Sequence, residues 1–353
     1  MGGGLLQLVA YGAQDVYLTG NPQITFFKVV YRRHTNFSIE SIQQTFNGSA
    51  GPNKRVTCQI SRNGDLVHKL YVVFDSTTTT DVDARDYIKK VEVEIGGQLI
   101  DRQYGDWMKI WNELTLPAGK KDGYAKMVGG TDATGKRYVP LEFWFCRNIG
   151  LALPLIALQY HEVKINIEFD NVASDDFTDA TLWADYIFLD TDERRRFAQL
   201  SHEYLIEQLQ YTGDETMTNG KLTAKLSFNH PVKELIWRTT DSDGTTAKKS
   251  GSAKLMLNGN DRFAQRDAKY FTHVQPYQHH TNIPDMASHI NVYSFALKPE
   301  EHQPSGTLNM SRIDTAQLQL TDGDGAGTTT KIYAHSYNVL RILSGMGGLA
   351  YSN

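Results

Sequence analysis

The sequence predicts an all-β protein built from two tandem β-sandwiches, with only a few short helices. Three observations lead to this prediction. Aromatic residues make up 11% of the 353 residues, with 18 Tyr and 15 Phe, which favours β structure. Short strand-like runs recur along the chain with turn sequences between them, as in sandwiches and jelly rolls. A sparse set of landmarks also recurs in the same order in each half of the chain.

The first half contains strand-like runs of β-branched, aromatic and alternating residues. The predicted strands are Ile24–Tyr31, Arg55–Ile60, Leu66–Phe74, Tyr87–Ile95, Gln98–Arg102, Leu141–Phe145 and His161–Phe169. Gly96-Gly97 predicts a tight hairpin between the fourth and fifth of these strands. The segment Asp106–Leu116 predicts a helix, because Trp107, Ile110, Trp111 and Leu114 fall on one stripe of it. The stretch from Pro117 to Gly135 predicts a loop.

The stretch Asp185–Gln210 predicts a strand, a short charged helix and a second strand, and we interpret it as the joint between the two halves. Thr191 is expected to cap the helix. Asp192 and Glu193 then lie in the first turn, where negative charge favours the helix dipole. Phe197 and Leu200 are three residues apart and share one helical face. The predicted linker between the sandwiches therefore runs over residues 191–203, with Tyr204–Gln210 as the strand that follows.

The second half repeats the pattern. Its predicted strands are Lys221–Phe228, Val232–Trp237, Ala253–Leu257, Ile290–Leu297, Asp314–Leu320, Lys331–Asn338 and Val339–Leu343. The recurring landmarks are a Gly turn before Asp-Arg, an aromatic strand before a proline, and a terminal strand at nearly equal distance from that proline. The Gly turn and Asp-Arg are Gly97…Asp101-Arg102 in the first half and Gly259…Asp261-Arg262 in the second. The aromatic strand and its proline are Phe143–Phe145 with Pro154, and Tyr293–Phe295 with Pro304. The terminal strands contain Tyr186 and Tyr337.

Composition and motifs exclude several classes of function. The net charge of -4 offers no global electrostatic basis for binding nucleic acid. Cys58 and Cys146 form no CxxC pair and are predicted to be buried free thiols in a reducing compartment. His279 and His280 are adjacent, so in an extended chain they point to opposite faces and would rarely bind one metal together. We expect hydrogen-bonding roles in loops for them, and we expect no metal or cofactor.

Two further groups of residues have a functional and a structural interpretation. The five tryptophans, Trp107, Trp111, Trp144, Trp183 and Trp237, could line a sugar site, but core positions are the favoured interpretation. Asn-x-Ser/Thr sequons begin at Asn36, Asn47 and Asn309. We do not expect glycosylation there, because the sequence lacks a secretory signal and predicts a protein that folds in the cytosol.

Long phrases in fixed order carry a resemblance to a known family. They are YGAQDVYLTGNPQITFFKVVYRRHTNFS (Tyr11–Ser38), PLIALQYHEVKI (Pro154–Ile165), YIFLDTDERRRFAQLSHEYLIEQ (Tyr186–Gln208), LNGNDRFAQRDAKYF (Leu257–Phe271), INVYSFALKPEEHQPSGTLNMSRID (Ile290–Asp314) and NVLRILSGMGGLAYSN (Asn338–Asn353). With these segments the chain resembles the major capsid proteins of the nucleocytoplasmic large DNA viruses, from near its first residue to its last.

The resemblance implies a double jelly-roll of two eight-stranded sandwiches. The implied division is an N-terminal segment (1–20), a first jelly roll (21–190), a helical linker (191–203) and a second jelly roll with a C-terminal tail (204–353). It also implies a structural protein without catalysis that forms a homotrimer, a pseudo-hexagonal capsomer of an icosahedral shell.

The same resemblance implies where the protein works and what it contacts. The implied partners are neighbouring capsomers, minor capsid proteins and penton proteins, together with the internal viral membrane through Met1–Gly20. Direct nucleic-acid binding is not expected. The implied location is the virion, assembled in the host cytoplasm.

Three alternatives remain open at this point. A minor capsid paralogue of the same fold would differ from the major protein in its copy number per particle. A lectin-like jelly-roll module would bind glycans as a monomer. A jelly-roll glycosidase or a metal-dependent cupin would need a carboxylate pair or a ligand triad, and the sequence shows neither in a distinguishing context.

Overall fold

The computed structural model describes residues 3–76, 82–129, 135–172, 177–242, 246–323 and 329–351. The chain divides into two compact units, Met1–Asn36 and Phe37–Asn353. Each unit is described by itself below. Within the described residues, no helix is both long and apolar enough to cross a membrane.

The N-terminal unit contains two short helices, α1 (Gly3–Val9) and α2 (Val16–Thr19). The predicted strand Ile24–Tyr31 is wrong, because these residues adopt no regular secondary structure. The prediction assumed that an apolar run would lie inside a covered sheet. Instead its large side chains are exposed, and that of Phe27 is 96% exposed. An extended segment needs a neighbouring strand to satisfy its backbone groups, and none pairs with it in the described residues.

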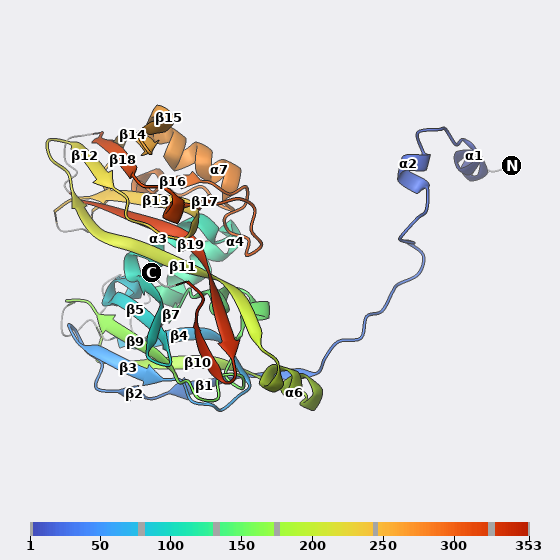
Figure 1. The fold of residues 1–353 in the computed structure, drawn as a ribbon, viewed down its shortest axis with the longest axis horizontal. Coiled ribbons are helices and arrows are strands. Elements are labelled where there is room, and N and C mark those ends of the chain that lie inside the picture. Colours follow the sequence, from blue (N-terminus) through green and yellow to red (C-terminus); the bar gives the residue numbers. More distant parts are fainter. Residues whose placement is uncertain are drawn as a thin grey trace. The chain divides into compact units, whose positions relative to one another are not determined.

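The second unit begins with a sandwich of two antiparallel sheets (Figure 1). One sheet has the order β1-β10-β4-β7, and β8 pairs with β4; the other has the order β2-β3-β9-β5-β6. The strands of the first sheet are β1 (Phe37–Gln44), β4 (Leu66–Ser76), β7 (Gly135–Pro140), β8 (Leu153–Pro154) and β10 (Asp179–Leu189). Those of the second are β2 (Phe46–Asn47), β3 (Arg55–Gln59), β5 (Ile88–Ile95), β6 (Gln98–Tyr104) and β9 (Val163–Phe169).

A second sandwich follows after helix α6 (Thr191–Gln199). One sheet has the order β11-β19-β13-β16, with β17 on β13 and β20 on β19; the other has the order β12-β18-β14-β15. The strands are β11 (His202–Thr216), β12 (Lys221–Lys225), β13 (Pro231–Thr240), β14 (Ser250–Leu257), β15 (Asn260–Asp267), β16 (Asn291–Ser294), β17 (Leu308–Asn309), β18 (Ala316–Asp322), β19 (Thr329–Leu343) and β20 (Met346–Leu349).

The two sandwiches have one topology. In the first sandwich β10 pairs with β1 on one side and with β4 on the other. In the second sandwich β19 pairs in the same way with β11 and β13, and both arrangements are those of a jelly roll. The Gly turn before Asp-Arg lies at equivalent hairpins, β5–β6 and β14–β15, and Tyr186 and Tyr337 lie on the equivalent strands β10 and β19. The predicted double jelly-roll is therefore confirmed.

Helices occupy the connections. They are α3 (Gly105–Thr115), α4 (Ala118–Val128), α5 (Trp144–Arg147), α6 and α7 (Gln275–His279), the last preceded by a π-helical turn, η3 (Tyr270–Val274). Short 3₁₀ turns lie at Ala84–Tyr87, Ile149–Leu151, Met286–Ser288 and Met310–Arg312.

Aromatic side chains fill the space between the sheets of each sandwich. In the first sandwich the Phe74 ring meets those of Tyr87 and Phe177 edge-on, at centroid distances of 5.3 and 5.1 Å. In the second, Phe271 packs against Trp237 at 5.1 Å. Edge-to-face and tilted contacts of this kind add to the free energy of simple apolar burial.

The predicted strand Leu141–Phe145 is wrong in type. Trp144–Arg147 forms α5, and the strand that pairs with β4 is β7, which precedes it. Phe143, Trp144 and Phe145 are all buried in one core. A strand would direct Trp144 away from its two neighbours, whereas a helical turn lets all three rings reach the same core.

Two other local predictions need correction. Residues 118–128 form α4 where a loop was expected. The prediction failed because the glycines of this segment have low helix propensity. Asn112 of α3 anchors the helix by donating to the Tyr124 hydroxyl at 2.8 Å. At α6 the N-cap is Asp190, whose Oδ1 accepts from the Thr191 N–H at 2.8 Å, so Thr191 is the first helical residue and not the cap.

Candidate functional site: the junction of the two sandwiches

Helix α3 of the first sandwich lies on the outer face of a sheet of the second (Figure 1). Its stripe of Trp107, Ile110, Trp111 and Leu114 is the one predicted from the sequence. This stripe packs on a set of buried side chains from β13, β16 and β19, which are Ile236, Val292 and Tyr333. Burial of four large side chains contributes on the order of 6–12 kcal/mol before entropic costs. The contact makes the two sandwiches one body.

A buried ionic network adjoins this apolar contact. Glu207 on β11 accepts from Arg147 at 2.8 Å and from Lys233 at 2.9 Å. His335 on β19 lies between the two carboxylates, 3.1 Å from Glu207 and 3.2 Å from Glu234. Glu234 also pairs with His280 at 2.9 Å. These charges are protected from water, so each must keep its partner.

Arg147 connects the network to the apolar stripe. It belongs to α5 of the first sandwich, yet it pairs with Glu207 of the second. Its guanidinium also lies over the Trp111 ring, 4.1 Å from the centroid, in a cation–π contact. Arg147 therefore takes part both in the ionic network and in the aromatic packing of the junction.

The environment shifts the pKa values of several groups in this network, among them Glu234, His280 and Lys233. Burial opposes ionisation of Glu234, but the charge of His280 and hydrogen bonds from His280 and His335 outweigh it and hold its pKa below the usual range. Burial likewise opposes a charge on His280, yet Glu234 and Glu300 raise the pKa of His280 to about 9. Burial lowers the pKa of Lys233, against the attraction of Glu207. The His280–Glu234 pair is thus ionised near neutral pH.

Further backbone and carboxylate contacts bind the two sandwiches to each other. The Leu209 N–H donates to Asp101 Oδ1 at 3.1 Å, and Gln208 donates to the Ile100 carbonyl. Burial raises the pKa of Asp101 to about 7. Lys331 pairs with Asp106 at 2.9 Å, at the first turn of α3. These contacts add to the apolar stripe and the ionic network in holding the two sandwiches together.

The C-terminal tail supplies a third contact between the sandwiches. Tyr160 donates its N–H to the Gly345 carbonyl at 3.0 Å, and His161 Nδ1 lies 2.9 Å from the Gly347 carbonyl oxygen. A Cβ at Gly347 would lie 2.7 Å from a Leu158 methyl, so a side chain at this position would have to displace the end of Leu158. Close packing of β20 against this loop thus favours glycine at position 347.

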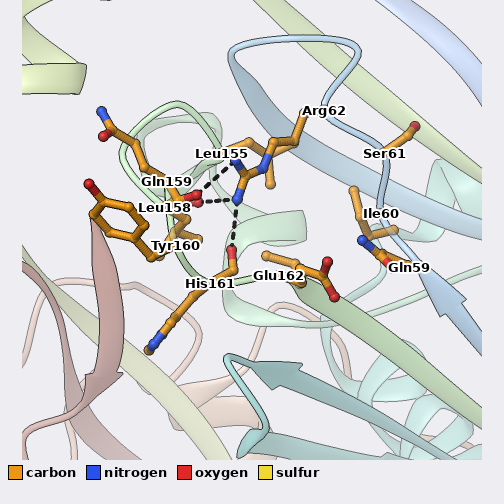
Figure 2. A pocket seen from close by; sticks show the side chains of 11 residues that line it. Gln59, Ile60, Ser61, Arg62, Leu155, Leu158, Gln159, Tyr160, His161 and Glu162 are labelled. Carbon is orange, nitrogen blue, oxygen red and sulfur yellow. Dashed lines mark hydrogen bonds between the residues drawn. The ribbon is translucent and has the colours of Figure 1, made fainter.

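The loop that receives the tail is held from the first sandwich by Arg62. Figure 2 shows its guanidinium donating to the backbone carbonyls of Leu158, Gln159 and His161, at 2.5, 3.0 and 3.1 Å. These residues line a shallow pocket of about 380 Å³. The Arg62 guanidinium is already bonded to three backbone carbonyls of this pocket, so we assign it a structural role.

The residues singled out from the sequence lie at varied positions. Thr191, Asp192 and Glu193 form the first turn of α6, Phe197 packs beside Leu66 and Ile187, and Leu200 is 62% exposed.

Of the tryptophans, those at 107, 111, 144 and 237 are buried core residues, whereas Trp183 is half-buried. Cys58 and Cys146 are buried free thiols. Among the described residues, no group of three or more His, Cys, Asp or Glu side chains could hold a metal ion.

The sequons and the histidines complete this comparison. Asn36, Asn47 and Asn309 are exposed, and the side chain of Asn309 accepts from the Ser311 N–H. His279 does not have the expected position in a loop: it is the last residue of α7 and contacts the Leu297 carbonyl oxygen. His280, which follows the end of that helix, belongs to the buried network. Sequence reasoning missed Glu207 and Glu234 as well. The available signal was a carboxylate inside an apolar strand, as in VKELIW.

Two equivalent sandwiches joined by a buried junction define a double jelly-roll protein. The chain matches the crystal structure of PBCV-1 VP54 with a TM-score of 0.83 and 40% identity, over 93% of this chain and 100% of that one. It also shares its fold with the Faustovirus major capsid protein, with a TM-score of 0.75 at 12% identity over 94% of each chain.

Sequence comparison identifies the family. The model for the major capsid protein N-terminus matches residues 25–190, and the model for the large eukaryotic DNA virus major capsid protein matches residues 193–348. The chain is 58% identical to the major capsid protein of Pyramimonas orientalis virus and 45% identical to that of Paramecium bursaria Chlorella virus 1, over the full length of each. It belongs to the family of major capsid proteins of large eukaryotic DNA viruses, and it is a structural component of the virion capsid.

We predict that stability falls at alkaline pH through His280. A group whose pKa is raised on folding stabilises the protein fully below its ordinary value of 6.5, and this stabilisation is lost as pH rises through about 9. The loss is on the order of 3 kcal/mol per chain. Guanidinium unfolding at a series of pH values, at fixed protein concentration, measures it.

The His280→Gln variant should be less stable than the parent at pH 6 and should lose most of this dependence between pH 7 and 9.5. Lys233 makes the free energy of unfolding depend on pH with the opposite sign, because its pKa is lowered on folding. The difference between the parent and His280→Gln profiles therefore isolates the histidine contribution. His279→Gln is the matched control and should keep the parent profile. A His280→Gln profile with the parent slope would contradict the assignment.

Proposed function

We propose that three copies of this chain close into a ring of six sandwiches, a pseudo-hexagonal capsomer that tiles the icosahedral shell. The observation that supports this most strongly is the junction itself. It makes two equivalent sandwiches into one stiff unit, and three such units can repeat one contact around a closed axis. An obligate contact of this kind buries more than about 2,000 Å² and is largely apolar.

The other partners follow from the same role. Contacts between capsomers, and with minor capsid and penton proteins, are weaker and wetter than those within the ring, which permits correction of errors during shell growth. The chain acts by burial and geometry without catalysis and without direct nucleic-acid binding, in line with its net charge of -4. Assembly takes place in the host cytoplasm.

The N-terminal segment 1–20 faces the inside of the shell and contacts minor capsid proteins or the internal membrane. Its support is chemical: Leu5, Leu6, Leu8 and Val9 of α1 are all exposed, and a row of exposed large apolar side chains needs a partner. Crosslinking in intact virions should connect this segment to inner components. Labelling of it by a reagent confined to the virion exterior would contradict the proposal.

We predict that the purified chain sediments as a trimer of about 120 kDa, three times its mass of 39.8 kDa. Analytical ultracentrifugation over a range of concentrations measures this directly. A stable monomer at micromolar concentration would contradict the proposed ring.

The division of the chain gives a further prediction about the linker. In the proposed division, residues 21–190 contain the first jelly roll, whose strands begin at Phe37, residues 204–353 contain the second, and 191–203 helps to set the angle between them. In Leu200→Pro the proline removes the N–H that now donates to the Arg196 carbonyl at 3.1 Å, so the end of α6 should unravel. Trimer assembly should then fall more than the unfolding temperature, as measured by sedimentation and by calorimetry.

Two further variants serve as controls for Leu200→Pro. Leu200→Ala keeps the backbone N–H and should assemble normally. Trp107→Ala removes a fully buried ring from the junction and should cost about 3–5 kcal/mol of unfolding free energy. Normal trimers from Leu200→Pro would show that the α3 contact alone orients the sandwiches.

A further inference from the structure

The sheet face that α3 covers has a definite composition. Four register-paired residues cross the outer face of the β11-β19-β13-β16 sheet in one row: Tyr211, Tyr333, Ile236 and Val292. The last three are fully buried beneath α3. The helix that covers them lies in the connection between β6 and β7 of the other sandwich.

The first sandwich has an equivalent face that no helix in the described part of its own chain covers in this way. The corresponding row of the β1-β10-β4-β7 sheet is Gln43, Trp183, Tyr71 and Pro140. Trp183, Tyr71 and Pro140 are half-buried. The Tyr71 ring lies parallel to that of Trp183, with centroids 6.4 Å apart, and 6.2 Å from that of Tyr138.

This aromatic face borders a hollow of about 790 Å³ whose lining is largely apolar. Its lining includes Leu116, Tyr124 and Met127 of the α3–α4 region and Tyr71, Tyr138 and Pro140 of the sheet. Tyr138 is 39% exposed. Aromatic side chains around an open hollow are typical of the centre of a protein interface.

The second sandwich also has an equivalent of α3. The segment η3–α7 lies between β15 and β16, the same connection that α3 occupies between β6 and β7. Its inner side is anchored, because Phe271 packs in the core and Gln275 accepts from the Ser294 N–H at 3.0 Å. Its outer side presents Val274 and Tyr277, three residues apart, and the Tyr277 side chain is 77% exposed.

We propose that η3–α7 of one copy docks into the aromatic hollow on the first sandwich of the next copy, with Tyr277 as its anchor. This contact repeats between chains what α3 does within one chain: a helix from the connection between equivalent strands covers the outer face of the following sandwich. Six such contacts, alternating within and between chains, close a ring of three copies. The inference rests on the proposed trimer and assigns the surfaces that build it.

The second copy is favoured as the occupant because the chain carries both halves of the contact. The face that α3 covers on the second sandwich and the open face of the first sandwich are formed by equivalent strands. The helices α3 and η3–α7 likewise lie in equivalent connections. An unrelated partner would have to match the open face without this relationship. A small apolar ligand in the hollow would leave Tyr277 unexplained.

Crosslinking between two single-cysteine chains tests the proposal. One chain carries Lys69→Cys, an exposed position on the hollow, and the other carries Gln278→Cys, beside Tyr277 on α7. The chains are co-expressed and treated with a short bis-maleimide. Because each chain carries one new cysteine, a crosslink between the two positions joins different copies. The native Cys58 and Cys146 are buried and serve as an internal background.

A covalent dimer should form at least about tenfold more from the mixture than from either variant alone, and peptide mapping should place the bridge between positions 69 and 278. A trimer by sedimentation without this crosslink would overturn the assigned surfaces and leave the proposed trimer standing. An unmodified chain that stays monomeric would instead overturn the trimer itself. The two failures are therefore distinguishable.

A substitution gives an independent measure. Tyr277→Asp should weaken trimer association about a hundredfold, the size expected for an aromatic anchor at the centre of an interface. Because the side chain is exposed within one chain, the circular dichroism spectrum of the variant should not change. Leu343→Asp, at a 62% exposed apolar position on the far end of β19, is the matched control and should assemble as the parent does. Equal association of the two variants would overturn the role of Tyr277.

Discussion

The architecture of this capsid protein depends on the burial of one helix stripe against a sheet of the other sandwich. Strands β13 and β19 carry apolar residues on both faces: one face fills the core of the second sandwich, and the other needs cover. Helix α3 provides that cover from the first sandwich. Neither sandwich alone would present a satisfactory surface to water, so the two behave as a unit.

The charges beside this stripe restrict the geometry further. A purely apolar contact would tolerate sliding, because dispersion and burial have little directionality. Glu207 and Glu234 lie in a dry environment and lose much free energy if Arg147, Lys233 or the histidines move away. We interpret the network as a device for a unique orientation of the two sandwiches. In a shell, where many identical units must fit, a unique orientation matters more than a few kcal/mol of added stability.

Much of the fold could be predicted from the sequence because strand patterns are local. The hairpin at Gly96-Gly97, the α3 stripe and the helix between the sandwiches were all readable from neighbouring residues. The failures have a common cause. The run Ile24–Tyr31 is strand-like in composition but has no paired neighbour in the described residues. The aromatic run Phe143–Phe145 forms a turn because three rings enter one core. The site was less predictable, since Arg147, Glu207 and Glu234 are distant in sequence and their residue types alone show no pairing.

The sequence by itself determined the all-β class, the tandem repeat, the position of the joint and, through long shared phrases, the family. These depend on local patterns and on residues read in order. Only the tertiary structure decided what α3 covers, why the carboxylates of β11 and β13 can stay ionised while buried, and which side chains the glycines of the tail pack beside, those of Leu158 and Tyr160. Each of these depends on two segments brought together by folding. Pairing across such distances is set by the summed packing of the whole chain, which local patterns do not record.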